Sequence, residues 1–133
     1  MVDEIEPAWT VESIPDVDRV FMRAHEMHFR DGKLQPGVFR QHGDGMSVDW
    51  EKYSTPPETK GRAKKPSENA VVGFIVGVVR AIPSLEVQHK PERSNRAHSN
   101  VMGLPSQNDP ELVEIRLKLL RISTVVLELE IAR

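Results

Sequence analysis

The most continuously apolar stretch, residues 70–82, constrains the fold more than any other part of the chain. It reads Ala-Val-Val-Gly-Phe-Ile-Val-Gly-Val-Val-Arg-Ala-Ile, and most of its side chains are β-branched, which favours a strand over a helix. We therefore predict a buried strand over residues 70–75, followed over residues 76–82 by a short helix or turn that Pro83 ends. The competing interpretation is a single helix that places the two glycines on one face.

The same stretch is too short to cross a membrane, because a spanning helix needs about 20 apolar residues. The first residues are acidic and lack the basic and apolar segments of a secretory signal. The chain has no cysteine, which removes disulfides and thiolate chemistry from consideration. We expect a cytoplasmic protein with no membrane partner.

The length of 133 residues suits one domain with its own core. Residues 1–14 contain several carboxylates and neither lysine nor arginine, so they are predicted to form an acidic N-terminal arm. This arm is expected to be ordered only if Ile5 and Trp9 dock on the remainder. Residues 15–133 are predicted to form the single domain.

Residues 54–69 contain three prolines, several cations and no large apolar side chain, which predicts a mobile Pro/Lys-rich loop. Thr55 is placed to cap a short helical turn that begins at Pro56. The cations of residues 60–65 do not alternate with aromatic side chains, and the net charge of the chain is -2. Nucleic acid is therefore not an expected partner.

Alternation of apolar and polar side chains predicts further strands, because successive side chains of a strand point to opposite faces. Glycine and proline turns separate these segments, as is typical of antiparallel sheets. An alternative for the first segment is a helix over residues 16–29. The predicted strands cover residues 19–25, 46–50, 85–89 and 97–104.

The C-terminal region carries the clearest helical pattern. Asn108 or Asp109 is placed as the cap and Pro110 as the first helical residue, and the helix is predicted to reach about Ile122. Residues 124–131 either continue it or form a strand. Together these elements predict an α+β fold, a small and mainly antiparallel sheet packed by an amphipathic C-terminal helix. The apolar stripe of the helix and tail includes Leu112, Ile115, Leu119, Ile122 and Val126.

Two motifs, Met46-Ser-Val-Asp49 and Asn95-Arg-Ala-His98, are separated by a proline-rich break and an apolar strand. In this order the chain resembles a set of small uncharacterised bacterial proteins, over roughly residues 19–104. The resemblance implies a bacterial cytoplasmic origin and one compact α+β unit. It implies no activity and no site residues.

Polar side chains from the predicted strands share one face if the strands pair. Arg23, Arg40, Ser47 and Asp49 would then surround a small pocket together with His98. His98 would act as the base or acid, Arg23 would hold an anion, and Asp49 would orient the imidazole. This arrangement fits a phosphate-bearing ligand.

A second group of candidate ligand-binding residues lies in the basic loop between two predicted strands. His89 precedes this loop, which carries Arg93 and Arg96. Such a loop can hold a phosphate or carboxylate. The alternative is a solvated basic loop.

The pair His25 and His28 is the first candidate for metal ligation. On a helix the two imidazoles would share a face, but on the predicted strand they point apart. We therefore predict no metal site. Since no phosphate-binding or dinucleotide-binding motif is present, we also predict no cofactor.

Two hypotheses for the function are favoured, and metal binding by the histidines is a third. The first is a non-enzymatic interaction module that binds a protein partner or a second copy of itself through Leu112, Ile115, Leu119, Ile122 and Val126. The alternative is a small enzyme or ligand-binding protein that uses Arg23, Asp49 and His98. The alternative requires these three side chains to lie in one cleft.

Overall fold

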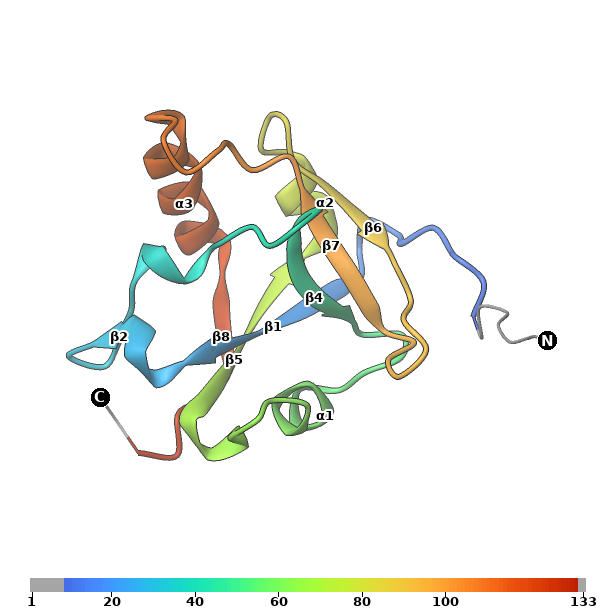
Figure 1. Cartoon of the computed structure of the whole chain (residues 1–133), viewed down its shortest axis with the longest axis horizontal. Helices are drawn as coiled ribbons and strands as arrows, with labels where there is room; N and C mark the ends of the chain where they lie inside the picture. The colour runs from blue at the N-terminus through green and yellow to red at the C-terminus, as the bar shows by residue number, and fades with distance from the viewer. Residues whose placement is uncertain (1–8, 132–133) are drawn as a thin grey trace.

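The computed structural model describes residues 9–131 of the chain (Figure 1). Its elements are strands, three α-helices and three short 3-10 helices. In chain order they are β1 (Arg19–His25), η1 (Glu26–His28), β2 (Phe29–Arg30), β3 (Lys33–Leu34), η2 (Pro36–Val38), β4 (Met46–Trp50), α1 (Pro56–Gly61), η3 (Pro66–Glu68), β5 (Asn69–Ile75), α2 (Val76–Arg80), β6 (Glu86–His89), β7 (His98–Met102), α3 (Glu111–Ile122) and β8 (Thr124–Leu127).

Six strands form one antiparallel sheet in the order β6-β7-β4-β1-β5-β8, and β2 pairs with β3 in a separate hairpin. The predicted α+β class is confirmed. Side chains from the strands pack with α2, α3 and η2 into one apolar core. Figure 1 shows α2 and α3 towards one side of the sheet and α1 towards the other.

The apolar stretch of residues 70–82 divides as predicted, into strand β5 and helix α2. β5 lies in the sheet between β1 and β8, so its side chains are buried except at Ile75. Close packing explains both glycines of the stretch. A Cβ at Gly77 would lie 2.9 Å from the side chain of Asp16, and one at Gly73 would lie 3.2 Å from Val126.

The alternating segments are strands, as predicted. Residues 19–25 form β1 rather than part of a helix, and the other three segments contain β4, β6 and β7. Beyond β1 the chain turns at Asp31 and Gly32, both with positive φ, and this turn joins β2 to β3.

Helix α3 begins at Glu111, one residue after the predicted start, with Pro110 as its N-cap. The Asp109 carboxylate accepts a hydrogen bond from the backbone N–H of Glu111 at 2.9 Å. The helix ends at Ile122, and the following residues form strand β8 rather than more helix. Val126 therefore belongs to the edge strand of the sheet and not to the helical stripe. The β-branched side chains of the tail favour this extended structure.

Residues 54–69 have more structure than a loop prediction allows. Thr55 caps α1, and the Glu58 side chain reaches back to the Thr55 backbone N–H, which completes a capping box. Ser54 and Thr59 are buried, and their hydroxyl groups hydrogen-bond each other at 2.8 Å. The composition hides this ordering because polar contacts, rather than apolar burial, hold the segment on the sheet.

Candidate functional site

The sheet opens into a cavity because β1 and β4 pair over a short distance. Their register covers two pairs, Val20↔Trp50 and Phe21↔Asp49. Beyond these pairs β1 continues beside β5, and β4 continues beside β7, so the two strands diverge (Figure 1). A cavity of about 740 Å³ lies where they separate.

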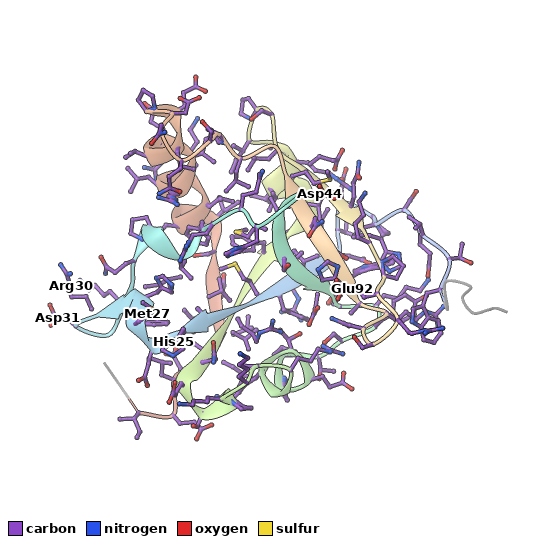
Figure 2. All side chains as sticks on the ribbon, viewed as in Figure 1. His25, Met27, Arg30, Asp31, Asp44 and Glu92 are labelled. Carbon is purple, nitrogen blue, oxygen red and sulfur yellow. The ribbon has the colours of Figure 1, made fainter. Side chains whose placement is uncertain are left out.

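Arg23, Asp49 and His98, the three residues predicted to share a cleft, all line this cavity. Arg23 comes from β1, Asp49 from β4, and His98 from β7, where it lies opposite Asp49 in the register. Figure 2 shows two further lining residues, His25 at the end of β1 and Glu92 in the loop between β6 and β7. The complete lining consists of Phe21, Met22, Arg23, His25, His28, Val38, Arg40, His42, Met46, Ser47, Val48, Asp49, Thr59, Arg62, Asn69, Glu92, Ser94, Asn95 and His98.

Asp49 lies on the cavity wall with its side chain almost fully buried. Its carboxylate accepts hydrogen bonds from Thr59 Oγ1, Arg62 Nη1 and Asn95 Nδ2, each at 2.8 Å. A buried carboxylate needs such donors to replace lost hydration. Asp49 therefore joins α1 and the loop before β7 to the sheet. The role predicted for Asp49, which is to orient His98, belongs to another group.

That group is the backbone carbonyl of Lys90, which lies 2.8 Å from His98 Nδ1. A carbonyl can only accept a hydrogen bond, so Nδ1 carries the proton in the neutral imidazole. The other nitrogen, Nε2, then accepts a hydrogen bond from Ser47 Oγ at 3.3 Å. The Glu92 carboxylate lies 3.8 Å from Nδ1.

Positive charge dominates another part of the lining. No carboxylate within residues 9–131 forms an ion pair with Arg23 or Arg40. Burial, the charge of Arg40 and the neighbouring His25 lower the pKa of His28 below its usual range. The wall thus holds cationic groups that repel one another, in a chain whose net charge is -2.

The histidines of the cavity do not form a metal site in the described part of the chain. His25 Nε2 lies 3.0 Å from the Glu68 carboxylate, and His25 Nδ1 accepts a hydrogen bond from the Met27 N–H. No group of three or more His, Asp or Glu side chains within residues 9–131 is arranged to hold a metal ion.

His89 and Arg96, predicted as ligand-binding residues, lie outside the cavity and hold the N-terminal segment instead. His89 is 1% exposed, accepts a hydrogen bond from the Glu12 N–H and donates one to the Arg96 carbonyl. The Arg96 guanidinium lies 4.7 Å from the Trp9 ring and 4.0 Å from the Tyr53 ring. These contacts occupy both side chains, because the segment docks along the β6 edge.

The described part of the predicted N-terminal arm, including Trp9, is therefore docked on the rest of the domain. The Glu12 carboxylate accepts hydrogen bonds from Lys52 and from the Tyr53 hydroxyl, and Ile14 is buried in the core. Ile5 lies outside the described residues. Arg93, the third predicted ligand-binding residue, is exposed in the β6–β7 loop and does not line the cavity.

Of the residues predicted to form a protein interface, the four on α3 are part of the core or packed against it. Leu112, Ile115 and Leu119 are 5%, 8% and 0% exposed, because this side of α3 packs into the apolar core. Ile122 is partly buried against the same core, and Val126 lies beside Gly73. In the folded chain the apolar stripe is thus covered by the chain itself.

Sequence reasoning missed the groups that fix Asp49 and His98. Arg62 belongs to the cations of the predicted mobile loop, residues 54–69. Thr59 and Arg62 are three residues apart, however, so they share one side of the α1 region. The helix-capping signal at Thr55 could have revealed this. The Lys90 carbonyl has no sequence signal, since any residue offers the same backbone group.

The comparisons with known proteins leave the site to be judged on its geometry. No family model matches the chain, and the searches of curated proteins and of solved structures give no significant match. None of the helices within residues 9–131 has the length and apolar character to span a membrane. The fold defines an antiparallel α+β domain with a polar cavity where strands β1 and β4 diverge.

Proposed function

We propose that this protein binds a small anionic ligand, bearing a phosphate or carboxylate group, in the cavity between β1 and β4. The observation that carries the proposal is the pair Arg23 and Arg40, which line the cavity with no carboxylate partner in the described residues. Guanidinium groups hold phosphates and carboxylates through charge-assisted hydrogen bonds.

The remaining charges of the cavity favour the same ligand. Asp49 is engaged by Arg62, so its negative charge is largely compensated within the protein. Repulsion between Arg40 and His28, which contributes to the lowered pKa of His28, would be relieved by a bound anion. The ligand therefore gains favourable contacts and removes an unfavourable one.

Nuclear magnetic resonance titration with inorganic phosphate and with succinate tests the proposal. We expect chemical-shift changes at Arg23, Arg40 and His28, with saturation at one site. Arg23→Gln and Arg40→Gln should each weaken binding about tenfold, as expected for the loss of one charge-assisted hydrogen bond.

Arg30→Gln is the matched control, because Arg30 is an exposed arginine at the tip of the β2–β3 hairpin and does not line the cavity (Figure 2). This variant should bind both anions as the wild type does. Equal losses in all three variants would indicate a general charge effect and contradict a defined site. An absence of shifts at the cavity residues would also contradict it.

The interaction module remains the second candidate, on a different surface. Val113 and Leu117, one turn apart on α3, are 62% and 43% exposed. Light scattering during size-exclusion chromatography tests self-association through this pair. A dimer that Leu117→Asp dissociates would support it, whereas a monomeric wild type would exclude self-association.

A further inference from the structure

We propose that Ser47 is a nucleophile and His98 its general base, and that together they hydrolyse small esters carrying an anionic group. This inference rests on the proposed function, because the anion site positions the substrate. The observation behind it is a chain of hydrogen bonds, from Ser47 Oγ to His98 Nε2 at 3.3 Å and from His98 Nδ1 to the Lys90 carbonyl at 2.8 Å.

The chain of hydrogen bonds gives each group one role. Since the Lys90 carbonyl requires the proton on Nδ1, Nε2 presents its lone pair to the Ser47 hydroxyl. This is the relation of nucleophile, base and orienting acceptor that activates serine in hydrolases. The distance of 3.3 Å is long for a hydroxyl–imidazole bond, as is common before substrate binds.

Rigid elements hold the pair. Ser47 lies on β4 and His98 on β7, and these strands are registered through four residue pairs from Met46↔Val101 to Asp49↔His98. Ser47 is exposed and lines the cavity, so a substrate can reach its hydroxyl. A serine on a paired strand loses little entropy when it reacts, because its backbone is already fixed.

The charges of the site suit the reaction. The Glu92 carboxylate, 3.8 Å from His98 Nδ1, stabilises the imidazolium that forms when His98 takes a proton. Arg23 and Arg40 line the same cavity and hold an anionic group of the substrate or the developing oxyanion. Hence an anionic ester should be preferred over a neutral one.

The reaction balances with water as the co-reactant. Ser47 Oγ attacks the ester carbonyl carbon while its proton passes to His98 Nε2, and the tetrahedral intermediate forms. The C–O bond to the leaving alcohol then breaks, and His98 returns the proton to that alcohol. Water attacks the resulting acyl-serine in the same way, with His98 as base, and releases the acid and free Ser47.

Hydrolysis of p-nitrophenyl hemisuccinate, compared with neutral p-nitrophenyl acetate, tests the inference. The wild type should prefer the hemisuccinate. Ser47→Ala should reduce hydrolysis to the uncatalysed rate, and His98→Gln should reduce it by about 10²- to 10⁴-fold. Ser106→Ala is the matched control, because Ser106 is exposed, lies outside the cavity lining and has no imidazole partner within residues 9–131. It should retain full activity.

A fluorophosphonate gives a second readout, since Ser47 Oγ displaces fluoride from phosphorus and peptide mass spectrometry then finds the adduct. Circular dichroism and succinate binding of Ser47→Ala are the controls that test whether this variant is folded. Succinate binding without hydrolysis or labelling of Ser47 would overturn this inference and leave the proposed function intact. Labelled Ser47 with equal rates on both esters and no succinate binding would overturn the anion site and the substrate class. Hydrolysis that persists in Ser47→Ala would overturn the nucleophile.

Discussion

At the scale of single residues, Asp49 shows how a polar side chain can belong to a site without acting in it. Its three donors come from α1, from the residue after that helix and from the β6–β7 loop, so its carboxylate joins segments that are distant in the chain. Asn95 and Asp49 belong to the two sequence motifs that also supply Ser47 and His98. The motifs therefore meet in the cavity.

His28 provides a prediction at the same scale. Arg40→Gln removes one of the charges that lower the pKa of His28, so this pKa should rise, while burial keeps it below the usual range. Saturating phosphate should also raise it, because the anion favours the imidazolium. Titration of the His28 ring protons measures both effects, and Arg30→Gln should leave the pKa unchanged.

The sign of the stability effect follows from this pKa. The unfolded chain binds a proton at His28 near pH 6.5, whereas the folded chain does so only at lower pH. Stability therefore falls as the pH drops below about 6.5 and through the folded pKa. Arg40→Gln should reduce this loss in urea denaturation, and a loss identical to that of the wild type would contradict the assigned repulsion.

The residues of the site were predictable in part. Strand alternation placed Arg23, Ser47 and Asp49 on one face, because period-two patterns determine side-chain direction. The hydrogen-bond partners of Asp49 and His98 were not predictable, since they depend on backbone carbonyls and on the docking of α1.

At the scale of elements, alternation and helical periodicity identified the strands and α3, but not which strands would separate. The cavity exists because pairing between β1 and β4 stops after two registered pairs. Register depends on the partners of each strand across the whole sheet, and local sequence carries little of that information. Helix α3 also shows that an apolar stripe predicts burial but does not predict whether the same chain or a partner buries it.

Two leucines of α3 test this assignment of its faces. Leu119 is fully buried, so Leu119→Ala should lower the free energy of unfolding by about 2–5 kcal/mol. Leu117 is 43% exposed on the other side, so Leu117→Ala should change it by about 0.5 kcal/mol or less. Urea denaturation of both variants measures the difference. Equal effects would contradict the orientation of the helix.

At the scale of the whole molecule, the N-terminal segment, described from Trp9 onward, docks along the β6 edge of the sheet. Arg80 contributes by binding the Ile14 carbonyl, Asp16 and Glu86, the last at 2.5 Å. Glu12 contributes through Lys52 and Tyr53. Alongside the burial of Ile14, these polar contacts hold the segment, and they depend on charge.

Acid should release this segment before the sheet unfolds. Hydrogen bonds donated by Lys52 and Tyr53 lower the pKa of Glu12 below its ordinary value of 4.5. A lowered carboxyl pKa stabilises docking above the ordinary value, and this contribution is lost as the pH falls through the lowered pKa. The indole resonance of Trp9 should then shift, whereas that of Trp50, which donates to Asp18, reports the sheet.

Glu12→Gln mimics the protonated side chain and should produce the shifted Trp9 resonance already at neutral pH. Glu58→Gln is a control, because Glu58 caps α1 and does not contact the segment. Simultaneous changes at Trp9 and Trp50 during acidification would contradict independent release.

The pairing between β1 and β4, with two registered residue pairs, is also the shortest strand pairing in the sheet. On one side of this pairing lie β6, β7 and β4, and on the other lie β1, β5 and β8. The sheet is therefore two three-stranded halves joined through two registered residue pairs, and the cavity lies where the two halves diverge. A ligand that contacts Arg23 on one half of the sheet and His98 on the other would link the two halves. Its occupancy would add contacts across the place where the sheet has the fewest registered pairs.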